Sequence, residues 1–137
     1  MLSVNQYPQK HVDQCRARIA AQIKAYDAIV ADGLAKSKSR AAFDAEFFNN
    51  LVVVLDASFM HRSRTLELKD GNPANEVRML SASILQNDGV LAGDKTIKYA
   101  ADKSIAGIAI GESISLDAAR FNALFKAYFK EIEAKFA

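Results

Sequence analysis

The sequence has little of what most readily identifies a function. It has a single cysteine, Cys15, which excludes a disulfide within the chain and fits a reducing compartment. The 18 basic and 16 acidic residues leave a net charge of only +2, which is too small to indicate a nucleic-acid or membrane partner. No apolar run approaches the roughly 20 residues of a membrane span, and the N-terminal residues lack the apolar core of a signal peptide. We therefore expect a soluble, cytoplasmic protein.

Motifs of catalysis and cofactor binding are absent as well. The chain contains no P-loop, no dinucleotide-binding glycine pattern, no Gly-x-Ser-x-Gly turn, no HExxH and no CxxC pair. We therefore predict no cofactor, and the sequence leaves open whether the chain catalyses any reaction. Without repeats or low-complexity segments, the 137 residues predict a single domain over 1–137 that buries its own core, preceded by a loose lead-in at 1–8.

Apolar residues recur at helical spacing in four segments. A first stripe runs from Val12 to Val30 and stops at Asp32-Gly33, where glycine suits a helix end. A second helix is predicted from about residue 40 to 69; its Val52–Val54 run alone would suggest a strand, but helical spacing extends to both sides. Further helices are predicted over about 73–86 and from residue 115 or 117 to about 136. Asn72-Pro73 suits the start of the third.

Residues 90–115 differ in their periodicity from these helices. Thr96–Tyr99 and Ser104–Ile110 alternate between apolar and other residues with the period of two that is typical of half-buried strands. The predicted fold is therefore mainly α (α+β): a four-helix antiparallel bundle with a β-hairpin at 90–115 inserted between helices three and four.

The antiparallel arrangement predicts a polar pocket at one end of the bundle. Arg62, Arg64 and Arg78 can clamp a carboxylate or phosphate, so the pocket can bind a small anionic ligand. Acidic partners are present in nearly matching number, which favours instead an internal network of ion pairs, Arg64 with Glu76 and Arg78 with Glu67. A small enzyme, with His61 as general base near Ser58 or Ser63, is a further alternative. The candidate ligand-binding residues are His61, Arg62, Arg64, Glu67, Glu76 and Arg78.

A metal site is another hypothesis for the same end of the bundle. His11 and Cys15 lie four residues apart on one helix face, and His61 should approach them from the next helix. Imidazole and thiolate are good ligands for zinc and similar ions. The alternative is that Cys15 is a buried, inert thiol, because it falls on the core stripe.

Self-association is the last expectation. The second helix is apolar on several faces, and the last helix is rich in aromatic residues, so either could form a homodimer interface unless the hairpin covers it. We therefore predict a small binding or interaction protein that self-associates and has a polar pocket at one end. Nucleic-acid binding is not expected, because the basic connector at 36–40 and the Arg62/Arg64 pair fall at opposite ends.

Overall fold

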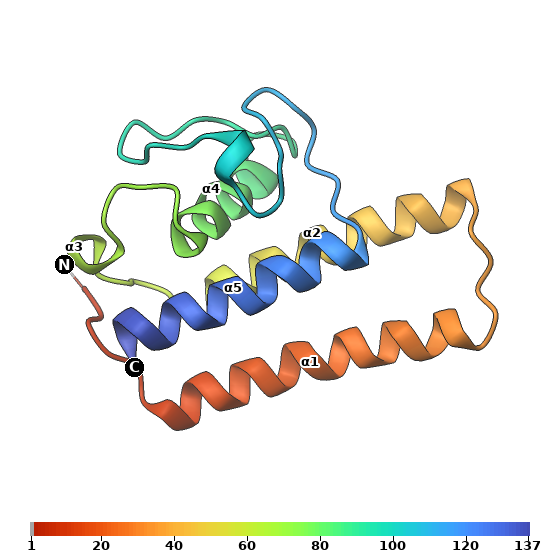
Figure 1. Ribbon diagram of the computed structural model, residues 1–137, viewed down its shortest axis with the longest axis horizontal. Helices are drawn as coiled ribbons and strands as arrows, with labels where there is room; N and C mark the ends of the chain where they lie inside the picture. Colours follow the sequence, from red (N-terminus) through yellow and green to blue (C-terminus); the bar gives the residue numbers. More distant parts are fainter. Residues whose placement is uncertain (1) are drawn as a thin grey trace.

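Four long helices form the frame of the protein in a computed structural model that describes residues 2–137 (Figure 1). A one-turn helix, α3, and a 3₁₀ turn, η1, lie in the connections between them. The elements in chain order are α1 (Gln9–Ala31), α2 (Lys38–Ser58), α3 (Arg64–Glu67), α4 (Pro73–Gln86), η1 (Ala101–Lys103) and α5 (Ala118–Phe136). The predicted helical class is confirmed, and the valine run at 52–54 is helical. Among residues 2–137, none of the helices combines the length and apolar character needed to cross a membrane.

Side-chain caps fix where three of the long helices begin. Asn72 accepts a hydrogen bond from the Asn75 N–H, and Pro73 follows at the first helical position, as its missing N–H allows. Asp117 accepts from the Arg120 N–H at the start of α5. Ser37 does the same for α2 by accepting from the Arg40 N–H. These caps satisfy backbone donors that a helix end would otherwise leave unpaired.

Helix α2 lies at the centre of the core. Its buried face packs against α5, and the two helices run parallel. The rings of Phe48 and Phe121 lie 5.5 Å apart, and seven residues later in both helices the Leu55 carbonyl accepts a hydrogen bond from the Tyr128 hydroxyl. Helix α1 runs antiparallel to α2, since Tyr26 bonds Asp44 near one end and His11 bonds the Ser58 carbonyl near the other. Helices α1 and α2 are therefore antiparallel, whereas α5 is parallel to α2.

The predicted β-hairpin at 90–115 is wrong. Within residues 2–137 no sheet forms, and strand pairing is limited to isolated bridges such as Asp70 with Lys98 and Val90 with Ser113. The segment is a long coil that passes over α4 and carries η1 where the hairpin turn was expected (Figure 1).

The physical reason for this difference lies in the backbone donors of the coil. Ile105 and Ala106 donate their N–H groups to the Glu76 carboxylate, and Leu116 donates to Asn49, so these groups bond side chains instead of a second strand. The alternation predicted burial only in part: Ala106 and Ile108 are buried, but Ile110, which the period of two places on the same side, is 55% exposed. Periodicity thus identified part of the side that faces the helices but not the hydrogen-bond partners.

The second correction concerns the length of the second helix. Helix α2 ends at Ser58 and not near residue 69, because Phe59 leaves the helical geometry with φ −129° and ψ 55°. His61 then adopts a left-handed φ of 62°, which turns the chain further from the helix. The chain then forms α3 before α4 begins. Residues 61–72 therefore become a separate corner of the molecule instead of the last turns of one helix.

Several segments meet at this corner. The N-terminal segment is held there, because Val4 exchanges backbone hydrogen bonds with His61 and Ser63, at 2.6 and 2.8 Å. Tyr7 donates from its backbone to Phe136 and from its hydroxyl to Met60. The two ends of the described chain consequently lie at the same end of the molecule as α3 (Figure 1). The end of α5 lies here too, because Lys135 contacts the Glu67 carbonyl.

Candidate functional site: an arginine cleft around a buried glutamate

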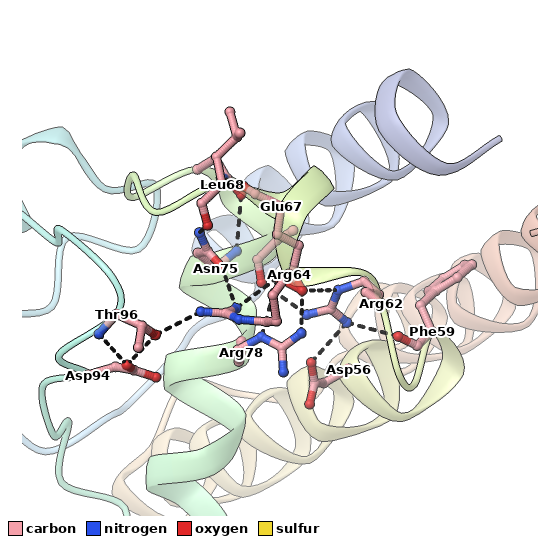
Figure 2. Close-up of polar contacts among 12 residues, drawn as sticks. Asp56, Phe59, Arg62, Arg64, Glu67, Leu68, Asn75, Arg78, Asp94 and Thr96 are labelled. Carbon is pink, nitrogen blue, oxygen red and sulfur yellow. Dashed lines mark hydrogen bonds and ion pairs between the residues drawn. The ribbon is translucent and has the colours of Figure 1, made fainter. Parts of the chain in front are cut away.

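Glu67 is the centre of the polar corner. Its side chain is fully buried, yet three guanidinium groups pair with it, those of Arg62, Arg64 and Arg78 (Figure 2). Arg78 binds both carboxylate oxygens, through Nε and Nη2, in the two-pronged geometry that arginine favours. A buried carboxylate needs such partners, because an unpaired charge away from water is very unfavourable.

Arg62 is enclosed by the fold. It donates to the carbonyls of Phe59 and Ala74 and to the Tyr128 hydroxyl, and it pairs with Asp56 at 3.0 Å. Burial alone would lower the pKa of Arg62, but the surrounding groups, among them Tyr128 and Asp56, raise it above its ordinary value. Burial also raises the pKa of Tyr128, so this residue stays a neutral hydroxyl. Arg62 therefore joins α2, α4 and α5 as a permanently charged structural residue.

Arg64 and Arg78 differ from Arg62 in their exposure. Their side chains are 39% and 30% exposed, compared with 1% for Arg62, so both can be reached from solvent. Arg64 is oriented by Asn75 at 3.0 Å and by Thr96 at 2.8 Å as well as by Glu67. These two arginines are thus held by buried partners while their outer edges face water.

The backbone on both sides of α3 is strained. His61 has φ 62°, and Leu68 has φ 68° with ψ −164°, a region that is almost exclusive to glycine. Asn75 bonds the Leu68 carbonyl, and Asn72 bonds the Glu67 carbonyl, so amides from the start of α4 hold this conformation. Strain of this size persists only where the surroundings fix it, and it concentrates at functional sites.

A cleft of about 550 Å³ opens beside the network. We call it the arginine cleft. Asp56, Arg62, Arg64 and Arg78 form its charged side. Its other lining residues come from the N-terminal segment, the α2–α3 connection and α3: Leu2, Ser3, Phe59, Met60, His61, Ser63 and Thr65.

The directly paired groups of this corner leave a positive excess. Three arginines carry three positive charges, and the carboxylates that pair with them, Asp56 and Glu67, carry two negative charges. Further out, Asp94 accepts two hydrogen bonds from Thr96, which lower its pKa, with a smaller contribution from Arg64 and Arg78. The predicted internal network therefore exists in part: Arg78 does pair with Glu67, but Arg64 also pairs with Glu67 and not with Glu76.

Glu76 does not lie in the arginine cleft. Its carboxylate faces the coil and accepts the N–H groups of Ile105 and Ala106 at 2.9 and 2.8 Å. Burial raises its pKa, and these two hydrogen bonds oppose that rise. Of the six predicted ligand-binding residues, the structure thus brings His61, Arg62, Arg64 and Arg78 to the cleft lining, with Glu67 behind them and Glu76 elsewhere.

The predicted metal ligands come together only in part. The Sγ of buried Cys15 lies 3.5 Å from His11 Nε2, and this nitrogen lies 2.7 Å from the Ser58 carbonyl. Since a carbonyl only accepts, Nε2 carries the proton and is not free as a ligand. His61 is exposed at the cleft, and residues 2–137 contain no group of three histidine, cysteine or acidic side chains placed to hold a metal.

The surfaces considered for self-association also differ from each other. The aromatic residues of α5, including Phe125 and Phe129, are buried within one copy of the chain. On α2, Phe43 is exposed and stacks on Phe47 at the end far from the arginine cleft. Self-association stays a prediction, and α2 is the helix that keeps an exposed aromatic residue for it.

Several residues of the site were not predicted from the sequence. Asp56, Asn75, Thr96 and Tyr128 complete the network from four different parts of the chain. Among these four residues, Asn75 had the clearest indication in the sequence. It lies in the first turn of a helix that begins at Asn72-Pro73, and in the sequence it falls between Arg64 and Arg78. Comparison with protein-family models, with curated proteins and with solved structures finds no match to this chain. The function must therefore be argued from these residues themselves.

Proposed function

We propose that this protein binds a small anionic ligand in the arginine cleft, with Arg64 and Arg78 as the binding residues. The observation that carries the proposal is that one buried carboxylate, Glu67, fixes two solvent-accessible guanidinium groups at the lining of a cleft. Arginine is well suited to carboxylates and phosphates because its planar group donates two parallel hydrogen bonds.

Preorganisation supports this role. A free arginine side chain loses roughly 2 kcal/mol of rotamer entropy when a ligand fixes it, whereas Arg78 is already held through Nε and Nη2. Within residues 2–137 its Nη1 has no hydrogen-bond partner, so that nitrogen keeps its donors for a ligand. Binding to such a group costs less entropy than binding to a mobile one.

The position of the positive charge supports an anion over a cation. Among residues 2–137, Asp56 is the one carboxylate in the cleft lining, and Arg62 already pairs with it at 3.0 Å. Hydroxyl groups of Ser63 and Thr65 also line the cleft and can donate to anionic oxygens. The lining thus offers more donors than acceptors to an incoming ligand.

Titration calorimetry with inorganic phosphate, at ionic strength matched with chloride, tests the proposal. We expect Arg64→Gln to weaken phosphate binding tenfold or more, because a hydrogen bond to a charged group contributes about 1.5–3 kcal/mol. Arg78→Lys should also weaken it, since lysine keeps the charge but not the fork.

Arg18→Gln is the matched control. Arg18 is exposed on α1 and forms no ion pair within residues 2–137, so its replacement should leave phosphate binding unchanged. If the wild type, Arg64→Gln and Arg18→Gln all bind phosphate equally, or none binds it, the arginine cleft is not an anion site. Unfolding curves recorded on each variant show whether it is folded at the titration temperature.

A further inference from the structure

An apolar surface forms the second side of the arginine cleft. Met60 and Leu2 line the cleft together with the arginines, and they are 58% and 66% exposed. Beneath them Phe59 also lines the cleft but is fully buried. Exposed apolar side chains are ordinary when they are scattered singly, but two beside fixed charges in one cleft are informative.

The backbone fixes this apolar side in place. Tyr7 donates its hydroxyl to the Met60 carbonyl at 2.7 Å, and burial raises the pKa of Tyr7 to about 12, so this donor persists at neutral pH. The bridge between Val4 and Arg62 holds the N-terminal segment, and with it Leu2, against the α2–α3 connection.

The left-handed turn at His61 separates the two sides of the cleft. Before the turn, Met60 is exposed; after it, Arg62 is buried and leads to Arg64 in α3. This conformation is unfavourable for a residue with a side chain, so the fold accepts strain at the position where the apolar and cationic sides meet. A ligand that only needed charge would gain nothing from the Met60 side.

We infer that the ligand of the arginine cleft is an organic anion, a phosphate monoester or carboxylate attached to an apolar body. Its anionic group lies on Arg64 and Arg78, and its apolar part covers Met60 and Leu2. This inference rests on the proposed function and narrows it from anions in general to amphiphilic ones. Covering part of two exposed apolar side chains should strengthen binding about tenfold.

Two matched pairs of probes test the inference: phenyl phosphate against inorganic phosphate, and benzoate against acetate. Each pair is titrated into the wild type, Met60→Ser and Leu85→Ser. Leu85 is the matched control, because it lies on α4 outside the cleft and is at least as exposed as Met60, at 66% compared with 58%. In at least one pair we expect the aromatic anion to bind about tenfold more tightly, and Met60→Ser but not Leu85→Ser to reduce that preference at least threefold.

The outcomes separate the inference from the proposed function. If phosphate or acetate binds in an Arg64-dependent manner but the aromatic member of each pair gains nothing, the inference is overturned and the anion site stands. If a preference exists but Met60→Ser and Leu85→Ser retain it equally, the apolar contact is not with Met60 and the inference is overturned as well. If none of the four probes binds, the proposed function fails and the inference fails with it.

Discussion

Glu67 and Glu76 are both buried glutamates in the same part of the chain, and the protein uses them in opposite ways. Glu67 is surrounded by cations, those of Arg62, Arg64 and Arg78. Glu76 is surrounded by backbone amides, those of Ile105 and Ala106. Burial is equally complete for the two side chains, so burial alone does not decide what a glutamate does in this fold.

The difference follows from where each carboxylate lies. Glu67 ends α3 at a corner where three elements and a cleft meet, and its charge organises arginines that solvent can reach. Glu76 lies in the first turn of α4 beneath the coil, and its carboxylate accepts hydrogen bonds from two backbone amides of that coil. One glutamate therefore shapes a surface that can bind a ligand, while the other stabilises a segment without secondary structure.

The largest effect should come from Glu67→Gln. The substitution keeps the shape but removes the charge, which leaves Arg62 buried at 1% exposure beside two more cations. Breaking a buried ion pair from one side costs about 3–5 kcal/mol. Urea denaturation should show a loss of unfolding free energy in this range, together with loss of phosphate binding where the variant is still folded.

Glu133→Gln is the control for this prediction. Glu133 pairs with Arg16 at the surface, where its side chain is 43% exposed. Exposed ion pairs contribute about 0–1 kcal/mol, so this variant should unfold close to the wild type. Equal, small losses in both variants would show that the charge of Glu67 does not hold the arginines.

Glu76→Ala should have a smaller and more local effect. It leaves the N–H groups of Ile105 and Ala106 without partners, while it also removes a charge that is unfavourable to bury. We expect a net loss of about 2 kcal/mol, because an unsatisfied buried donor costs about 1–3 kcal/mol. Hydrogen exchange should accelerate at the amides of residues 105 and 106, and phosphate binding should not change.

A uniform acceleration across α2 and α5 would contradict that prediction. It would mean that Glu76 supports the helical frame and not the coil in particular. The binding measurement is independent of this result: weaker phosphate binding in Glu76→Ala would mean that Glu76 acts on the cleft after all, as the sequence alone suggested.

The same contrast explains which parts of the structure could be predicted. The helices and their core faces follow from local periodicity, as for the stripe from Phe121 to Phe136 that is buried throughout. Chain direction predicted that His61 would approach His11, whereas His11 contacts the Ser58 carbonyl, three residues before His61. The end of the last helix also reaches the polar corner, where Lys135 contacts the Glu67 carbonyl. The frame was therefore accessible from spacing and short connections.

What could not be predicted depends on side chains that meet from distant positions. Nothing local distinguishes Glu67, which takes arginines as partners, from Glu76, which takes coil amides. The hydrogen bonds of Glu76 also explain why the predicted β-hairpin does not form. Its carboxylate accepts the backbone N–H groups of Ile105 and Ala106, which a hairpin would have paired with a second strand. Helix α2 also ends early, with Phe59 non-helical and a left-handed turn at His61, although the sequence has no glycine or proline there.

The smallest effect we predict is a pH dependence that belongs to Glu76. Its pKa in the folded protein lies above the usual 4.5, because burial disfavours the charged form more than the amides of Ala106 and Ile105 favour it. The folded state then holds the proton more tightly than the unfolded chain does, so this stabilising contribution is complete below pH 4.5 and is lost as pH rises through the folded pKa.

Unfolding free energies of the wild type and Glu76→Gln, measured from pH 4 to 7, test the sign of this pH dependence, because glutamine does not titrate. We expect the wild type to lose stability relative to the variant as pH rises; a relative gain would mean that the two amides stabilise this carboxylate better than water does, and burial would then not be the dominant influence on Glu76.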